Sequence, residues 1–180
     1  MFKKVLSTIF LVSGLLLTAQ GLFDISKRLG YYNLVTKSST IYNIPSSLTF
    51  QNIPSKISIK SLALTLPVES TEIKNGYWPT SQTGVSFLAN SGNLGNKGNL
   101  IFYGHNWKNL LGNLHKVKTG DTLVISGQNG QDFLYSIAYI ATVNADDVSI
   151  LADTNDERIT LYTCTGFLDQ KRLVVVAKRV

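Results

Sequence analysis

The amino-acid sequence predicts an all-β domain with short helices, preceded by one transmembrane helix. From residue 56 onward, runs of β-branched and aromatic residues alternate with short stretches of Gly, Asn and Asp, which is typical of strands joined by turns. The first 23 residues instead contain a long apolar segment without charge. A chain of 180 residues with 44% hydrophobic content can fill one core, but it is too short for two ordinary domains.

The N-terminal apolar segment, residues 5–23, is long enough to cross a membrane as a helix. At about 1.5 Å per residue it nearly spans a hydrocarbon core of about 30 Å. Lys3 and Lys4 precede it, so the positive-inside rule predicts a cytoplasmic N-terminus and an extracellular location for everything after Asp24. A cleaved signal peptide is the alternative, because Ala19-Gln20-Gly21 has the small-x-small pattern of a cleavage site.

These features divide the chain into three predicted parts. Residues 1–23 form a membrane anchor, residues 24–55 an extracellular linker or stalk, and residues 56–180 the folded domain. The linker is rich in Ser, Thr, Asn and Tyr, contains Pro45 and Pro54, and keeps neither helical nor strand periodicity for long.

The distribution of charge argues against nucleic-acid binding. The formal net charge is +6, yet residues 56–180 hold 12 Lys and Arg against 10 Asp and Glu. The surplus of positive charge is therefore mostly N-terminal, and no basic stripe of the kind that neutralises phosphates is present. A single cysteine, Cys164, excludes an intramolecular disulfide and a metal site with several cysteines.

Within the folded domain, seven or eight strands would make a sandwich or a closed barrel. The expected strands are residues 57–66, 85–89, 99–104, 121–127, 132–143, 158–164 and 172–180. Asn129-Gly130 predicts a hairpin turn, because both residues tolerate positive φ. Residues 107–118 are the stretch with helical character, since Leu110, Leu111 and Leu114 would form one apolar stripe.

Three residues with reactive side chains lie at the ends of predicted strands. His105 follows an apolar strand and a glycine, Cys164 closes a second strand, and Arg172 opens the last one. Only residues 165–171 join the Cys164 strand to the Arg172 strand, so the two can be hairpin neighbours with their side chains close together.

This combination of residues suits acyl transfer through a thioester. A thiol with a pKa of about 8.5 is a poor nucleophile at neutral pH unless an imidazole or a positive group favours the thiolate, and His105 can supply this help. The same imidazole can later protonate a leaving amine. The guanidinium of Arg172 is suited to holding the oxyanion that develops. Either a thiolate–imidazolium pair or two neutral groups could be the resting state.

The motif Thr160-Leu161-Tyr162-Thr163-Cys164 fits the TLxTC pattern of the sortase family in every fixed position. The Gly-Asn…Gly-His-Asn block of residues 98–106, a Leu…Gly-Asp element ending at Asp121, and an Arg-Leu-Val-Val strand also occur in family order. Over about residues 57–180 the chain therefore resembles a sortase. The resemblance implies a closed eight-stranded β-barrel with His105, Cys164 and Arg172 as catalytic residues, and no cofactor.

The resemblance also implies the reaction. Cys164 would attack the Thr carbonyl of an LPxTG-like sorting signal near the C-terminus of a secreted protein. An amine, either a cell-wall precursor or a pilin lysine, would then resolve the thioester. The enzyme would be a single-pass cell-membrane protein with an extracellular catalytic domain. Residues 85–89 and 146–157 are candidate walls of the peptide groove, whereas Tyr162 and Thr163 are interpreted as wall or packing residues.

Two alternatives remain open from the residues alone. One is a tethered cysteine hydrolase with water as acceptor, and the other is a non-catalytic, membrane-tethered β-barrel binding module. The surroundings of His105 and Cys164 do not match the His-Gly and Ser-x-Gly-Cys patterns of L,D-transpeptidases. His115, beside Lys116 and Lys118, is interpreted as a surface residue.

The sequence does not predict a calcium site. Some sortases use calcium, with acidic partners upstream of the histidine, but here the upstream positions are Asn90, Asn93, Asn96 and Lys97. An acidic cluster that precedes the Cys164 strand could offer oxygen ligands. Its members are Asp146, Asp147, Asp153, Asp156 and Glu157. The short 165–171 loop argues against sortase classes with a long insertion there, and residues 24–55 hold no Asp-Pro-aromatic lid motif.

Overall fold

The structure, a computed structural model, describes residues 14, 18, 20 and 52–180. The predicted membrane anchor and almost all of the predicted stalk thus lie outside the described residues. Among the described residues, none of the helices is both long and apolar enough to span a bilayer. The chain divides into one unit from Met1 to Pro45 and a second from Ser46 to Val180, and the second contains the strands discussed below.

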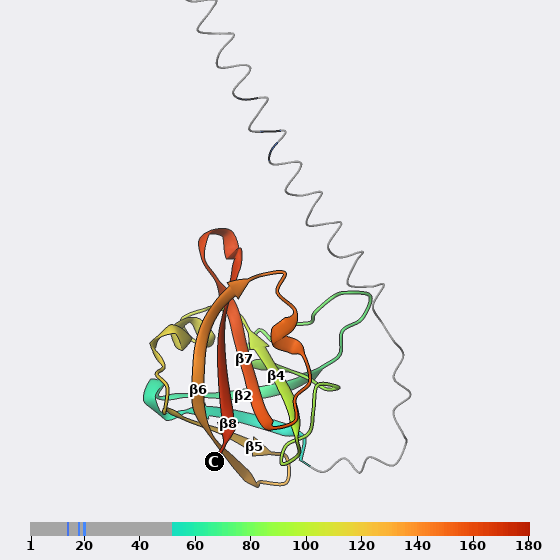
Figure 1. The fold of residues 1–180 in the computed structure, drawn as a ribbon, viewed down its shortest axis with the longest axis vertical. Helices are drawn as coiled ribbons and strands as arrows, with labels where there is room; N and C mark the ends of the chain where they lie inside the picture. Colours follow the sequence, from blue (N-terminus) through green and yellow to red (C-terminus); the bar gives the residue numbers. More distant parts are fainter. Residues whose placement is uncertain (1–13, 15–17, 19, 21–51) are drawn as a thin grey trace, which may run out of the picture. The chain divides into compact units, whose positions relative to one another are not determined.

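Residues 52–180 form eight strands that close into one barrel, which confirms the predicted closed eight-stranded β-barrel (Figure 1). The strands are β1 (Pro54–Ile59), β2 (Leu64–Thr71), β3 (Val85–Leu88), β4 (Gly98–Gly104), β5 (Thr122–Gly127), β6 (Asp132–Asn144), β7 (Glu157–Thr165) and β8 (Lys171–Arg179). Their order around the barrel is β1-β2-β3-β4-β7-β8-β6-β5. Neighbours are antiparallel except for β2–β3 and β4–β7, which are parallel.

One predicted strand was wrong, because residues 57–66 form two strands instead of one. A 3₁₀ turn, η2 (Lys60–Leu62), separates β1 from β2, and Ala63 ends it in the left-handed region with φ of 48°. The two strands then pair with each other, with Ile59 opposite Leu64. The other predicted strands agree with the observed ones to within one residue at each end.

The hairpin predicted at Asn129-Gly130 joins β5 to β6, but its turn differs from the expected one. Only Gly130 has a positive φ, of 81°. Its amide donates to the Gly127 carbonyl, and the Gly127 amide donates to the Gln131 carbonyl. This pattern fits a three-residue loop in which a tight turn is followed by one left-handed glycine.

The stretch predicted as helical contains η3 (Leu111–Lys116), a 3₁₀ helix. Leu110, Leu111 and Leu114 are buried in the barrel core, as the apolar stripe predicted. Gly112 is required at its position, because a Cβ there would lie 2.5 Å from the carbonyl oxygen of Asn106. Two further 3₁₀ turns are η4 (Ser149–Leu151), between β6 and β7, and η5 (Phe167–Asp169), between β7 and β8.

Side chains pack on both faces of the β3–β4–β7 region. The interior holds the main apolar core, to which β7 contributes Ile159 and Leu161. A second, smaller cluster lies on the outer face and consists of Leu88, Ile101 and Tyr103, with Trp78, Leu151 and Tyr162 packed against it. We call this second group the outer cluster. Since side chains alternate between the faces of a strand, it shows which residues of β4 and β7 point outward.

Candidate active site

Strands β4, β7 and β8 are neighbours in the barrel and bring the three predicted site residues into one row. The parallel register between β4 and β7 ends with Gly104 opposite Thr163. His105 directly follows Gly104, and Cys164 directly follows Thr163, so these two residues continue the same row. On the other side of β7, Cys164 is the direct cross-strand partner of Arg172. The hairpin neighbourhood predicted for Cys164 and Arg172 is confirmed.

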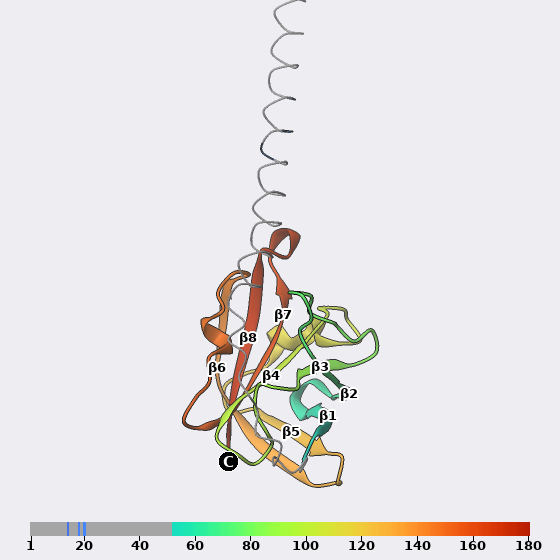
Figure 2. The same ribbon diagram turned by 90° about the vertical axis from the view of Figure 1, so that its right-hand side faces the viewer.

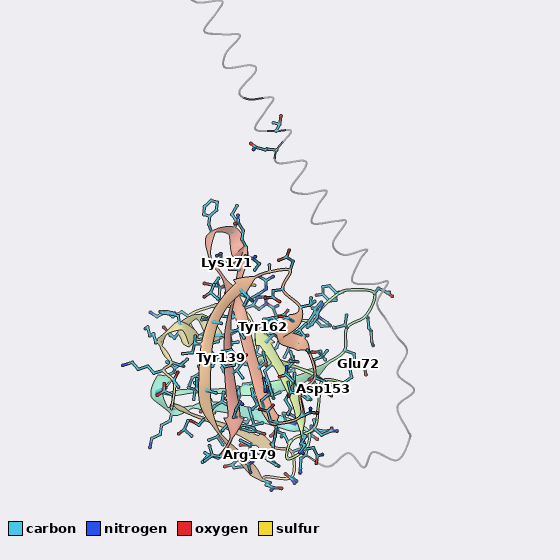
Figure 3. All side chains as sticks on the ribbon, viewed as in Figure 1. Glu72, Tyr139, Asp153, Tyr162, Lys171 and Arg179 are labelled. Carbon is cyan, nitrogen blue, oxygen red and sulfur yellow. The ribbon has the colours of Figure 1, made fainter. Side chains whose placement is uncertain are left out.

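This row belongs to the outer face of the barrel. Thr163 and Leu161 of β7 alternate with the outward-facing Tyr162, so Cys164 has the outward orientation of Tyr162. His105 likewise follows the alternation of Tyr103. Cys164 and His105 are half-buried. Strand β8 begins with Lys171 and ends with Arg179, and Figure 3 places these two residues at opposite ends of the barrel. The row therefore lies at the end where the β7–β8 hairpin projects (Figure 2).

The imidazole of His105 is held by two side chains. Its Nε2 lies 3.2 Å from Nε2 of Gln82, within hydrogen-bonding distance. Its ring stacks on the indole of Trp107, with 4.3 Å between the centroids and 6° between the planes. The hydrogen bond and the stacked ring restrict the imidazole in complementary ways, since stacking sets its plane and the bond sets its rotation within that plane.

The guanidinium of Arg172 is tied to the turn of the β7–β8 hairpin. Its Nη1 donates to the Asp169 carbonyl at 2.8 Å and to the Lys171 carbonyl at 3.0 Å. The turn brings the Asp169 carbonyl into place through left-handed backbone at Leu168 and Asp169, with φ of 51° and 59°. Among the described residues both of these bonds come from Nη1, and the guanidinium also carries donors on Nε and Nη2.

The two threonines of the TLxTC motif bind strand β4 rather than face a substrate. The Thr163 hydroxyl, which is buried, donates to the Gly104 carbonyl at 2.7 Å. The Thr160 hydroxyl donates to Oδ1 of Asn99 at 2.6 Å. Both bonds join β7 to β4 on the approach to the site, and the first fixes the peptide unit that precedes His105. The interpretation of Thr163 as a structural residue is confirmed.

The aromatic residues of the outer cluster pack on one another, with Tyr103 buried between Trp78 and Tyr162. Tyr103 stacks on Tyr162 at 5.6 Å, and Trp78 meets the edge of Tyr103 at 5.3 Å. The Tyr103 hydroxyl donates to the Pro79 carbonyl at 2.8 Å and lies 2.9 Å from Oγ1 of Thr71. Burial raises the pKa of this hydroxyl, so Tyr103 stays neutral. Its bond to Pro79 attaches the β2–β3 loop to β4.

The two segments expected to form groove walls differ in their exposure. All four side chains of β3, Val85–Leu88, are buried, whereas Ala89 is exposed. Residues 146–157 do lie against the outer face. Nδ2 of Asn99 donates to the Ile150 and Ala152 carbonyls, both at 3.0 Å, and this holds the η4 turn over β4.

The acidic residues that precede Cys164 do not converge. Asp147 caps Ser149, and Asp156 pairs with Arg158 and Lys178. The hydrogen bonds from Lys178 and Arg158 lower the pKa of Asp156 to about 2. Glu157 accepts a hydrogen bond from the Tyr135 hydroxyl. Across residues 52–180 and the three described N-terminal positions, no group of three or more His, Cys, Asp and Glu side chains could hold a metal ion.

Sequence reasoning missed the two partners of His105 and interpreted the second histidine correctly. Trp107 was considered only as the start of a helical stretch, although its spacing of two residues from His105 was visible. Gln82 carries no local signal, because it belongs to a loop that folds back onto the site from before β3. His115 is exposed, as expected for a surface residue, and its Nδ1 lies within hydrogen-bonding distance of the Gly112 carbonyl.

A closed β-barrel with a cysteine, a histidine and an arginine in one outer row has the arrangement of a cysteine transpeptidase. Comparison with known proteins identifies one family. The family model described as the Sortase domain matches residues 57–180. The chain therefore belongs to the sortase family.

Individual relatives agree with this assignment. The chain is 33% identical to Sortase A of Listeria monocytogenes over 86 residues, which are 46% of this chain and 38% of that protein. It is also 33% identical to the putative sortase YwpE of Bacillus subtilis over 88 residues, 47% of this chain and 85% of that one. The alignment thus spans well under half of the Listeria protein.

Solved structures show the same fold. A lid mutant of Sortase A from Corynebacterium diphtheriae superposes with a TM-score of 0.62 and 30% identity, covering 75% of this chain and 74% of that one. Sortase C1 from Streptococcus agalactiae gives a TM-score of 0.62 and 25% identity, covering 87% and 90% of the two chains.

Proposed function

We propose that this protein cleaves an LPxTG-like sorting signal and transfers the acyl group to an amine, with Cys164 as nucleophile. The observation that carries the proposal is the row formed by His105, Cys164 and Arg172 on adjacent strands. The strand register puts these three residues at one end of the barrel, and their side-chain chemistry is of the kind that acyl transfer requires. A vestigial binding module would not be expected to keep all three.

In the first half-reaction, the Cys164 sulfur attacks the Thr carbonyl carbon of the peptide. A carbon–sulfur bond forms and the Thr–Gly amide bond breaks, while the thiol proton passes through His105 to the leaving amine. The oxyanion that forms in between is held by the donors on Nε and Nη2 of Arg172.

In the second half-reaction, an amine attacks the thioester and gives its proton to His105. The carbon–sulfur bond breaks and the thiol is restored. We propose a cell-wall precursor or a pilin lysine as the acceptor, which would anchor or polymerise surface proteins. Residues 1–23 would tether the enzyme to the cell membrane and residues 24–55 would act as a stalk, with the catalytic domain, residues 56–180, outside.

Full-length protein in detergent, incubated with a library of Leu-Pro-x-Thr-x peptides and several amines, tests the proposal. We expect an acyl adduct on Cys164 by mass spectrometry and a ligated product that requires the amine. Hydrolysed peptide as the sole product at saturating amine would instead identify a hydrolase. Absence of both adduct and product from every peptide would refute the proposal.

Membrane topology is tested separately in cells. The protein should fractionate with membranes, and residues from Lys56 onward should be accessible to an external protease. Recovery of a soluble protein whose N-terminus is Leu22 would instead establish cleavage after Gly21.

A further inference from the structure

We propose that Gln82 is a positioning residue that holds the His105 imidazole in both of its protonation states. The inference rests on the proposed function, in which His105 gains and loses a proton during each half-reaction. It goes further by assigning a role to a side chain outside the His105, Cys164 and Arg172 row.

The contact itself supports this role. The Gln82 Nε2 lies 3.2 Å from the His105 Nε2, and an amide nitrogen can only donate, so the ring nitrogen accepts in this arrangement. In that geometry the proton of a neutral imidazole sits on Nδ1. Rotation of the carboxamide by 180° presents its oxygen, which can accept from Nε2–H of the neutral ring and of the imidazolium alike, so that Nδ1 is the nitrogen that takes up and releases the transferred proton. Gln82 can therefore stay bonded to His105 before and after proton transfer.

The backbone that carries Gln82 is held by its neighbours. Ser81 is 4% exposed, and its hydroxyl donates to Oε1 of Glu69 on β2. The same hydroxyl accepts from the amides of Thr83 at 3.3 Å and Gly84 at 2.9 Å. The Ser81 amide donates to Oγ of Ser86 at 2.9 Å. On the other side of Gln82, the Thr83 hydroxyl also donates to Oε1 of Glu69, at 3.2 Å, so the turn is bonded to β2 on both sides of Gln82 and to β3 through Ser81.

Gly84 closes this turn against β2. A Cβ at this glycine would lie 2.3 Å from the Pro67 carbonyl oxygen, so no larger residue can approach as closely. The result is a turn with one well-defined path that presents an exposed, polar side chain to His105. An exposed hydrogen bond contributes little to folding stability, so we infer that the Gln82–His105 contact serves the reaction rather than the fold.

The second partner of the ring completes the restraint. Trp107 stacks on the imidazole and sets its plane, but stacking alone allows the ring to rotate within that plane. Gln82 bonds to one nitrogen and removes this rotation. Without it, His105 would spend less time with a nitrogen directed at the thiol or the leaving amine, and turnover would fall while peptide binding would not.

The test uses full-length Gln82→Met, which keeps the length of the side chain and removes its hydrogen-bonding groups. Loss of one such bond predicts a fall in kcat of about 10-fold, with KM for the peptide changed less than twofold and with unchanged thermal unfolding. Gln128→Met, an exposed glutamine on the β5–β6 hairpin, is the matched control and should match wild type. Wild-type kcat in Gln82→Met, or a higher KM with unchanged kcat, would overturn the inference.

A second variant adds a readout that a merely structural role would not move. The carboxylate of Gln82→Glu can accept from the imidazolium but cannot donate to the neutral ring. We expect the pH profile of kcat/KM to move to higher pH in this variant, and an unchanged profile would contradict the proposal.

His105→Ala, measured in parallel, distinguishes failure of the proposed function from failure of the role proposed for Gln82. If His105→Ala keeps wild-type activity, the proposed function itself fails. If His105→Ala is inactive while Gln82→Met turns over like wild type, only the role of Gln82 fails.

Discussion

Replacing Arg172 by lysine separates charge from hydrogen-bond geometry in the proposed oxyanion site. Lysine keeps the positive charge but has one nitrogen in place of three. In the structure Nη1 is already committed to the Asp169 and Lys171 carbonyls, at 2.8 and 3.0 Å. A lysine ammonium directed to those carbonyls would have no second nitrogen to offer an oxyanion, whereas the arginine keeps Nε and Nη2.

The magnitude follows from the general cost of losing one oxyanion donor, which is about 10²–10³-fold in kcat. We expect Arg172→Lys to lose about 10²-fold and Arg172→Ala about 10³-fold, which corresponds to roughly 2.7 and 4 kcal/mol. Both losses should appear in kcat rather than in KM, because the interaction forms mainly in the transition state.

The assay is steady-state ligation with a sorting-signal peptide and an amine, combined with the rate at which Cys164 reacts with a small alkylating reagent. Alkylation forms no oxyanion, so it should change little in Arg172→Lys. Lys171→Ala removes the adjacent exposed cation and serves as the control for net charge. Full ligation activity in Arg172→Lys would refute the oxyanion role, and an unchanged rate in Arg172→Ala would remove this residue from the site.

Three other substitutions, with His115→Ala as a control, test the rest of the site. Cys164→Ala should abolish the acyl adduct and the ligated product without loss of thermal stability, and ligation that persists in this variant would contradict a thioester mechanism. His105→Ala should lose nearly all turnover while His115→Ala remains close to wild type in the same assay, so the reverse ranking would show that the wrong histidine was assigned. Thr163→Val keeps the shape of the side chain but removes the bond to the Gly104 carbonyl. It should lower the free energy of unfolding by about 1–3 kcal/mol in urea and also reduce kcat, and wild-type values for both would show that this bond is dispensable.

The strands were predictable because their apolar runs are long and their turns carry Gly, Asn and Asp. The exception is the junction of β1 and β2. Ala63 adopts a left-handed backbone with φ of 48° there, although alanine gives no sign of it in the sequence. The pairing of Ile59 with Leu64 overrides this local preference. The pairing of β1 with β2 therefore determines the turn at Lys60–Ala63, which the residue types there do not predict.

The site was predictable in part for a similar reason. A short loop suggests that Cys164 and Arg172 are hairpin neighbours, and the hairpin does form. The approach of His105 depends on the parallel pairing of β4 with β7, between which β5 and β6 intervene in the chain. No local pattern specifies this pairing, so His105 was assigned to the site from its chemistry and from the resemblance rather than from a predicted contact. Gln82 escaped notice because its position depends on Glu69 and Ser86, which lie on two different strands.

The threonine hydroxyls of the TLxTC motif have a consequence for how such motifs are interpreted. Thr160 bonds to Asn99, and Thr163 bonds to the Gly104 carbonyl. The two threonines of the motif therefore indicate the pairing of β7 with β4. In the proposed function, Cys164 is the one residue of the motif that reacts with the substrate. A homologue that kept both threonines but lost the cysteine would still build this junction, and it would be found by motif searches although it could catalyse nothing. Genome surveys that count such sequences as enzymes should therefore require the cysteine and the arginine of the following strand as well.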